Sequence, residues 1–185
     1  AIAPHYFLDE GICRFMGEVA RELDHIPIMM YSNPNFGANI DPRDFNTLAQ
    51  RYDNIIGLKD SSGDLALFDL YASETESNGT VLFMGDEKHM LHHSNCAPTI
   101  ANFDPHICRV IDNLEWHHDK MKTFQKIRHL GDILYCCGKK VRGGLKYALS
   151  LKGICKPYTA NKADGLNHHQ KNSIRSFVND YSVNT

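Results

Sequence analysis

Short, continuous apolar runs that each lead into a longer amphipathic segment restrict most strongly how this chain can fold. The clearest runs span residues 26–31, 54–59 and 81–84. They lack the strict apolar–polar alternation of a strand with one solvated face, so we expect strands that are buried on both faces. Apolar residues in the intervening segments recur at helical spacing. The pattern therefore predicts repeated strand–helix units around a parallel sheet.

The same pattern predicts about five strands, each followed by a helix, and then a helical tail. The first strand ends within residues 1–4. The last and weakest one covers residues 97–101, where Pro98 cannot donate to a strand ladder. We expect a strand–helix region over residues 1–105 and a helical region over residues 106–185. Helices are predicted over residues 10–23, from Pro42 onward, and over 65–73, 88–92, 105–114, 115–137, 141–151 and 167–180.

Composition narrows the class of protein. A chain of 185 residues with 42% hydrophobic and 23% charged residues has the proportions of a globular domain, not of a disordered chain, a collagen or a coiled coil. No apolar run approaches the ~18–20 residues of a membrane helix, so no membrane partner is expected. The net charge of −2 lacks the basic excess of a nucleic-acid-binding domain.

The six cysteines show no CxxC pair and no regular spacing. We interpret them as reduced thiols, which predicts a reducing, cytoplasmic location. Asn78-Gly79-Thr80 matches a glycosylation triplet, but in a reducing compartment it is better interpreted as a turn.

Lys59 ends an apolar strand and leads directly into the polar loop Asp60-Ser61-Ser62-Gly63-Asp64. Active sites of parallel α/β folds gather at the C-terminal ends of strands. Alternation predicts that Ile55 and Gly57 share a face with Lys59, and that Ile56 lies on the opposite face. Desolvation disfavours the charged form of an amine, and a neutral amine can form a Schiff base with a carbonyl. The alternative is a lysine that only extends to solvent at the rim.

Tyr31 holds the equivalent position on the preceding strand. Neighbouring strands lie ~4.8 Å apart, so Tyr31 and Lys59 can share one pocket. A phenol there can move a proton between a carbinolamine and a substrate hydroxyl. The alternative is a core tyrosine whose hydroxyl is satisfied within the protein.

The two strand ends also carry recognisable motifs. Tyr31-Ser32-Asn33-Pro34 is similar to a Tyr-Asn-x-Pro motif, and Gly57-Leu58-Lys59-Asp60-Ser61-Ser62-Gly63-Asp64 to a Gly-[Ile/Leu/Val]-Lys-[Asp/Glu]-[Ser/Thr]-Ser-Gly-Asp motif. Both motifs, in this order and at this spacing, resemble the dihydrodipicolinate synthase/N-acetylneuraminate lyase family. That family consists of class I aldolases with a (β/α)₈ TIM-barrel fold, in which these motifs end the fifth and sixth strands.

Other segments extend the resemblance over essentially the whole chain. Ala3-Pro4-His5-Tyr6 is similar to the segment after the family's fourth strand, and Gly85-Asp86 to the segment after its seventh. Ala101-Asn102 with Pro105 is similar to the segment after the eighth strand. Leu145-Lys146-Tyr147-Ala148-Leu149 resembles the family's C-terminal helix.

The resemblance implies a role for each candidate residue. Lys59 would form the Schiff base with pyruvate or a 2-keto acid, and Tyr31 would relay protons. Ser61, Gly85, Asp86 and Asn102 would line the mouth of the site, with Ser61 or Asp86 contacting the aldehyde. The family needs no cofactor and no metal, and its members are commonly homo-tetramers.

The chain departs from the family at its beginning, because it starts at the family's fourth strand. A complete barrel takes about 250 residues. We therefore expect a barrel that lacks its first three strand–helix units, together with the family's carboxylate-binding Gly-Thr-Thr-Gly-Glu loop. The rival hypothesis is a non-catalytic remnant or a half-barrel subunit. An unrelated α/β ligand-binding domain is the third hypothesis, and it requires both motifs to be coincidental.

Two local departures bear on the substrate. Ser32 stands where the family usually has asparagine, and Asn35-Phe36-Gly37 follows Pro34 where dihydrodipicolinate synthases carry an arginine. The missing arginine argues against the enzyme of lysine biosynthesis. It favours an aldolase for sugar acids, hydroxy-oxoglutarate or aromatic pyruvates.

The 11 histidines include His89 and His93, which could share one helical face. No HExxH motif accompanies them, so surface histidines are favoured over a zinc site. The sequence also lacks GxGxxG, GxxxxGK[ST] and GxSxG motifs.

Overall fold

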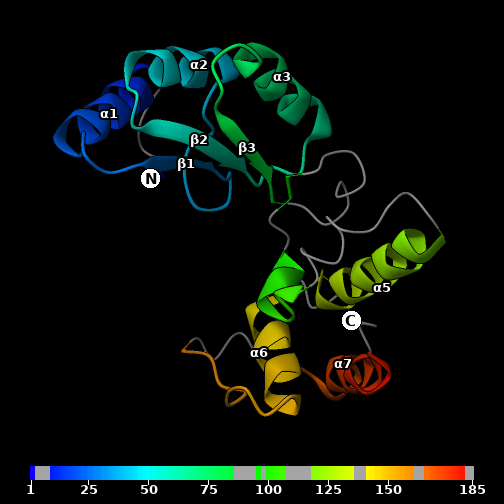
Figure 1. Ribbon diagram of the computed structural model, residues 1–185. Helices are drawn as coiled ribbons and strands as arrows, with labels where there is room; N and C mark the ends of the chain where they lie inside the picture. The colour runs from blue at the N-terminus through cyan, green and yellow to red at the C-terminus, as the bar shows by residue number, and fades with distance from the viewer. Residues whose placement is uncertain are drawn as a thin grey trace. The chain divides into compact units, whose positions relative to one another are not determined.

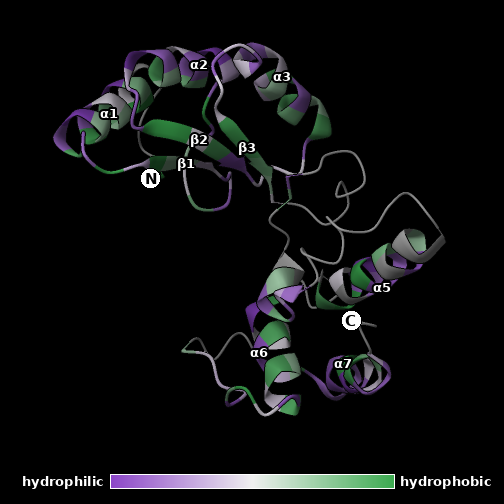
Figure 2. Cartoon of the chain, in the orientation of Figure 1, coloured by the Kyte–Doolittle hydropathy of each residue, from purple (hydrophilic) through white to green (hydrophobic). Residues whose placement is uncertain are grey.

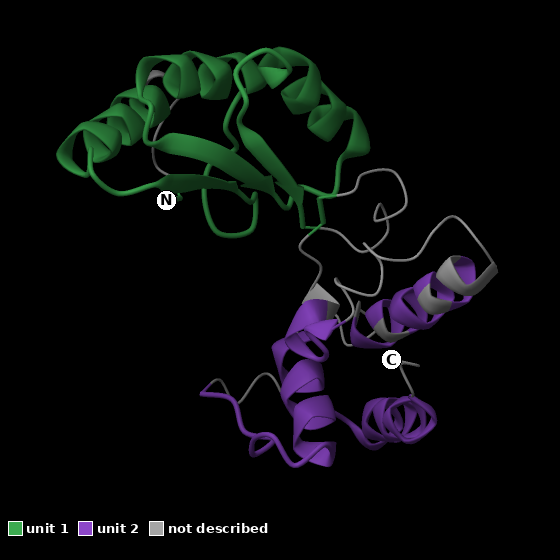
Figure 3. Cartoon of the chain, in the orientation of Figure 1, with its two compact units in different colours: residues 1–98 green, residues 99–185 purple. Residues whose placement is uncertain are grey.

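The computed structural model describes residues 1–2, 9–85, 95–96, 99–106, 118–135, 141–160 and 165–181. Two compact units, Ala1–Pro98 and Thr99–Thr185, make up the chain (Figure 3). The expected domain boundary after residue 105 stays a prediction, because compact units need not be domains that fold independently. Within the described ranges, no helix is long and apolar enough to cross a membrane.

The first unit contains a sheet of three parallel strands in the order β1-β2-β3. The strands are β1 (Ile28–Ser32), β2 (Ile55–Asp60) and β3 (Val81–Met84). Helices α1 (Asp9–Glu22), α2 (Pro42–Arg51) and α3 (Leu65–Thr75) alternate with them along the chain and cover one face of the sheet (Figure 1). The predicted strand–helix alternation around a parallel sheet is confirmed for residues 28–84, whereas residues 1–2 of the strand predicted within residues 1–4 are not in a strand.

The turns into two of the helices follow from short polar side chains. Asp41 caps α2 by accepting a hydrogen bond from the Arg43 amide (2.8 Å), and Pro42 occupies the first turn, where its missing N–H costs nothing. Asp64 caps α3 by accepting from the Leu67 amide (3.2 Å). Both caps end the loops that follow β1 and β2, and so they help to set the length of those loops.

The face assignment within β2 differs from the prediction. Ile28 pairs with Ile55, but Met29 pairs with Gly57, so Ile56 has no partner in the register with β1. Such an irregularity adds one residue to a strand and interrupts its alternation. Ile55 is therefore buried together with Leu58 in the helix-covered core, and Ile56 is 43% exposed. Gly57 and Lys59 keep the expected alternation beyond the irregularity.

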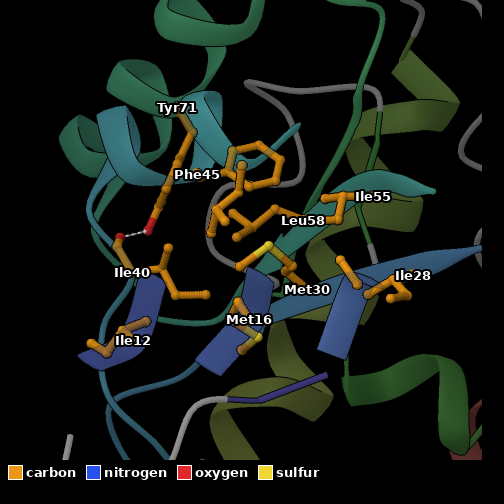
Figure 4. Packing of buried hydrophobic residues seen from close by; sticks show 11 residues of the cluster. Ile12, Met16, Ile28, Met30, Ile40, Phe45, Ile55, Leu58 and Tyr71 are labelled. Atoms are coloured by element: carbon orange, nitrogen blue, oxygen red, sulfur yellow. Dashed lines mark hydrogen bonds between the residues drawn. The ribbon is translucent and has the colours of Figure 1, made fainter. Parts of the chain in front are cut away.

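The core of the first unit lies between the sheet and its helices (Figure 4). Hydrophobic residues concentrate along β2 and β3 (Figure 2). Phe45 of α2 and Tyr71 of α3 meet edge to face with ring centroids 6.1 Å apart. The other buried members come from α1, β1, the loop before α2, α2 and β2: Ile12, Met16, Ala20, Ile28, Met30, Ile40, Leu48, Ile55 and Leu58.

Tyr71 is fully buried, and its hydroxyl donates a hydrogen bond to the carbonyl of Ile40 (Figure 4). Its oxygen also lies 3.4 Å from Oγ of Ser32. Burial raises the pKa of Tyr71 to about 12, and the nearby Asp60 and Asp41 carboxylates add to this effect. The hydroxyl therefore stays protonated and acts as a structural donor.

We expect Tyr71→Phe to lower the free energy of unfolding by about 1–3 kcal/mol, because it leaves the buried Ile40 carbonyl without its donor. Urea denaturation followed by circular dichroism measures the change. Tyr158→Phe is the matched control, since Tyr158 is 72% exposed and should lose almost nothing. Equal midpoints for the two variants would contradict the structural role of the Tyr71 hydroxyl.

The second unit is helical, with α5 (His118–Tyr135), α6 (Val141–Leu151) and α7 (His168–Asp180). Phe103 packs edge to face on Phe177 and Tyr181, with centroids 6.3 and 5.1 Å apart. Asn167 caps α7 in a reciprocal capping box with Gln170. Three of the four predicted tail helices are present, and the fourth, predicted over residues 105–114, lies largely outside the described residues.

The strand predicted over residues 97–101 is wrong for the part that the structure describes. Thr99–Asn102 forms a 3₁₀ helix, and parallel pairing beyond β3 consists, among the described residues, of one bridge between Met84 and Cys96. The prediction relied on apolar character alone, and a proline at position 98 has no N–H to donate to a ladder. Residues 97–98 and the helix predicted over 88–92 lie outside the described residues.

Candidate active site

Lys59 and Tyr31 lie on neighbouring parallel strands, near the carboxyl ends of β2 and β1. The register pairs them directly, and Lys59 also pairs with Phe83 of β3. Nζ of Lys59 lies 5.5 Å from the centroid of the Tyr31 ring, within the range of a cation–π contact. Both side chains are half-buried. Alternation from the buried Leu58 places Lys59 on the sheet face opposite the helices.

The Tyr31 hydroxyl is held by the loop that follows β1. Nδ2 of Asn33 donates to the phenolic oxygen at 2.5 Å. Oδ1 of the same side chain accepts from the backbone amide of Asn35 at 2.9 Å. Asn33 is 5% exposed, so both hydrogen bonds are largely screened from water.

The loop after β2 folds around the carboxylate of Asp60. This side chain is 2% exposed and accepts from the amide of Ser62 (3.2 Å) and from its hydroxyl (2.7 Å). Burial raises the pKa of Asp60, while the two hydrogen bonds from Ser62 act in the opposite direction. Oγ of Ser62 in turn accepts from the amide of Asp64, which caps α3. The chain that leaves Lys59 is thus tied to the start of the following helix.

Ser61 and Gly85 lie beside Lys59 because the strand ladders continue past the strand ends. The Ser61 amide donates to the Ser32 carbonyl (2.8 Å), and the Gly85 amide donates to the Asp60 carbonyl (2.7 Å). A Cβ at position 85 would lie 2.1 Å from Oγ of Ser61 and 3.1 Å from Cε of Lys59. Glycine at this position therefore leaves the space that the lysine stem and the serine hydroxyl occupy.

The structure brings four of the six candidate residues together: Lys59, Tyr31, Ser61 and Gly85. Asn102 belongs to the second unit, where it ends the 3₁₀ helix with an exposed side chain. Asp86, His89 and His93 lie outside the described residues. Among the side chains that the structure describes, no three His, Cys, Asp or Glu residues gather as ligands for a metal ion.

Asn33 is the residue of this site that the sequence analysis did not single out. The available signal was its place directly before Pro34 and just after a strand ending in tyrosine. An Asn in a turn commonly accepts from the backbone two residues ahead, which leaves its amide nitrogen to donate elsewhere. The tertiary structure decides that this donor meets the Tyr31 hydroxyl.

The arrangement places an amine beside a phenol on a half-buried sheet face. An amine in this setting can add to a carbonyl carbon, and a phenol within the same pocket can give and take the protons that this addition requires. These are the groups that imine chemistry needs.

Comparison with known proteins identifies the family of the chain. The sequence profile of the Dihydrodipicolinate synthetase family matches residues 1–172. A 4-hydroxy-tetrahydrodipicolinate synthase of Wigglesworthia glossinidia brevipalpis is 28% identical over 180 residues, covering 91% of this chain and 58% of that protein.

Solved structures share the fold. Dihydrodipicolinate synthase from Thermotoga maritima superposes with a TM-score of 0.84 at 16% identity, over 96% of this chain and 64% of that chain. A prophage protein of the same family from E. coli K12, solved in complex with pyruvate, gives a TM-score of 0.82 at 18% identity, with the same coverage of 96% and 64%. The chain thus spans less than two thirds of the length of these relatives. The profile match over most of the chain shows that this protein belongs to the dihydrodipicolinate synthetase family.

Proposed function

We propose that this chain carries the reacting groups of a class I aldolase or lyase that acts on pyruvate or another 2-keto acid. The observation that supports it is the direct pairing of Tyr31 with Lys59 at the carboxyl ends of two parallel strands. Active sites of parallel α/β folds form at this edge. A family member solved with pyruvate bound supports the choice of keto acid.

In the proposed reaction, the neutral amine of Lys59 adds to the C2 carbonyl carbon of pyruvate. The resulting carbinolamine loses its hydroxyl as water, and Tyr31 supplies the proton. The protonated imine then draws electrons from C3, so C3 gives a proton to the Tyr31 phenolate and an enamine forms. The enamine adds to the carbonyl carbon of an aldehyde, whose oxygen takes the proton back from Tyr31, and water releases the product from Lys59. Aldol cleavage is the same sequence in reverse.

The other candidate residues would shape the acceptor side. We propose that the hydroxyl of Ser61 contacts the aldehyde, because Ser61 Oγ lies beside Gly85 and the Lys59 stem. Gly85, which has no Cβ, leaves room for both side chains. Asp86 and Asn102 remain predicted contacts at the mouth of the site, implied by the family resemblance.

The acceptor aldehyde is proposed to differ from that of the lysine-biosynthesis enzyme. Asn35-Phe36-Gly37 follows Pro34 where the synthases carry a carboxylate-binding arginine. Phe36 is 65% exposed in this loop. An apolar ring in place of a cation favours sugar-acid, hydroxy-oxoglutarate or aromatic-pyruvate aldol chemistry over a second carboxylate.

The second candidate is a non-catalytic remnant, or a half-barrel subunit that needs another polypeptide to be active. The observation in its favour is that the chain matches only part of its relatives: 58% of the Wigglesworthia protein and 64% of each of the two solved structures. The 185 residues also contain no Gly-Thr-Thr-Gly-Glu segment, which in the family binds the pyruvate carboxylate. We propose that the sheet corresponds to the fifth to seventh strands of a (β/α)₈ barrel.

Intact-protein mass spectrometry after incubation with pyruvate and borohydride tests the proposal. We expect a mass increase of one reduced pyruvyl group, because reduction makes an imine permanent. No increase would favour the half-barrel or remnant. A second experiment then distinguishes the half-barrel from the remnant. The first three strand–helix units of a family member are added as a separate chain, and only a half-barrel would then form the pyruvate adduct.

A further inference from the structure

Asn33 is joined by a hydrogen bond to the phenol that the proposed function uses. From its geometry we infer that Asn33 is a positioning residue, whose side-chain amide fixes the direction of the Tyr31 hydroxyl for proton transfer at Lys59. The inference rests on the proposed function and adds to it a residue to which the family resemblance gave no role.

The backbone of Asn33 is held in place from several directions. Its carbonyl accepts from the amides of Phe36 (3.1 Å) and Gly37 (2.9 Å). Pro34 restricts the residue before it to extended conformations. Since the side chain is 5% exposed, it is held in a packed environment and not by solvent.

The orientation of the amide is determined by its two partners. The backbone N–H of Asn35 can only donate, so the group facing it at 2.9 Å must be the oxygen, Oδ1. The opposite group, 2.5 Å from the Tyr31 oxygen, is therefore the nitrogen, Nδ2, which can only donate. A flipped amide would set two donors against each other at Asn35.

The consequence for Tyr31 is directional. Because its oxygen accepts from Asn33, its own O–H hydrogen points away from Asn33 and is available to another acceptor. An N–H donor also stabilises an oxygen most when that oxygen is negatively charged, which is the state of a phenol that has just released its proton. Asn33 thus supports both halves of a relay, release and recovery of the proton.

Asn33→Asp tests this role because a carboxylate keeps the shape and still accepts from Asn35, but it cannot donate to Tyr31. We expect trapping of pyruvate by cyanoborohydride at neutral pH to slow by about tenfold or more. Lowering the pH should restore the rate, since a protonated carboxyl can donate again. Asn39→Asp is the matched control: it adds the same charge to the same loop at an exposed residue with no role in the site, and should trap at the wild-type rate.

The new carboxylate of Asn33→Asp could also act on Lys59 directly through its charge. The Tyr31→Phe background separates this effect from the loss of the hydrogen bond to Tyr31. If Asn33 acts through Tyr31, adding Asn33→Asp to Tyr31→Phe slows trapping no further. A second slowing of the same size in the Tyr31→Phe background would overturn the inference, as would an Asn33→Asp single variant that traps at the wild-type rate.

A readout without pyruvate keeps the result distinct from failure of the proposed function. In protein labelled with ¹³C at the tyrosine ζ carbon, Tyr31→Phe identifies the Tyr31 signal. We expect Asn33→Asp to shift that signal and Asn39→Asp to leave it in place. An unmoved signal overturns the pairing whether or not an adduct forms. If Asn33→Asp shifts the signal but the wild-type protein forms no adduct with pyruvate, the pairing stands. The proposed function is then overturned and, with it, the relay role.

Discussion

Lys59→Ala is expected to remove the borohydride-trapped pyruvate adduct completely. The reaction requires a primary amine at the position that pairs with Tyr31, and alanine offers none. Borohydride traps pyruvate only by reducing an imine to a secondary amine. Alanine at position 59 cannot form that imine, so no adduct at this site should remain. The expected result is therefore the unmodified mass within the detection limit of intact-protein spectrometry.

Two further variants separate loss of the amine from loss of packing. Lys59→Arg keeps a long side chain that can contact the Tyr31 ring, but its guanidinium stays protonated and does not form an imine. We expect no adduct from this variant either, together with near-normal stability.

Lys152→Ala is the matched control for the lysine. Nζ of Lys152 also lies over an aromatic ring, 4.4 Å from the centroid of Phe103, but that ring has no hydroxyl. This variant should form the adduct as the wild type does. An adduct that survives in Lys59→Ala and disappears in Lys152→Ala would move the chemistry to the second unit and refute the proposed site.

Gly57→Ala is the substitution with the largest expected effect on stability. A Cβ at position 57 would lie 2.1 Å from the carbonyl oxygen of Val81 and 3.0 Å from its carbonyl carbon, both backbone atoms of β3. The end of the Met29 side chain, at 3.1 Å, adds to the crowding. Side-chain rotation cannot relieve a clash with a backbone carbonyl, so β3 has to move away from β2.

We expect Gly57→Ala to lower the free energy of unfolding by about 2–3 kcal/mol, in the upper range for overpacked sites. Urea denaturation followed by circular dichroism gives the value. The pyruvate adduct should also decrease, because Lys59 pairs with Phe83 two residues further along the displaced ladder.

Gly17→Ala is the control for the same chemical change elsewhere in the first unit. The atom nearest to its added Cβ is the Tyr52 hydroxyl at 3.0 Å, the far end of a side chain that can move. Alanine also favours the helix over glycine by about 1 kcal/mol, which offsets the small adjustment. If Gly57→Ala unfolded at the same urea concentration as Gly17→Ala, the tight approach of β3 to β2 would be refuted.

Local patterns were enough to predict many of the elements. The strand at Val81–Met84 and the helix at Val141–Leu151 have the predicted bounds. Each is flanked by turn residues or by a clear change in the spacing of apolar residues. Strand β1 begins at Ile28, two residues later than the apolar run suggested. Nδ2 of Asn54 donates to the carbonyls of Ala20, Leu23 and Ile26, which ties residues before the strand to the end of α1.

The sequence by itself determined the parallel α/β class, the placement of Lys59 and Tyr31 at neighbouring strand ends, and the motifs that lead to the family. These features depend on periodicity and on residue order, both of which are local. The tertiary structure alone decided the burial of Ile55, the 3₁₀ helix at Thr99–Asn102 and the hydrogen bond from Asn33 to Tyr31. Each of these depends on strand register or on loop geometry, which arise from contacts between distant segments and leave no period in the sequence.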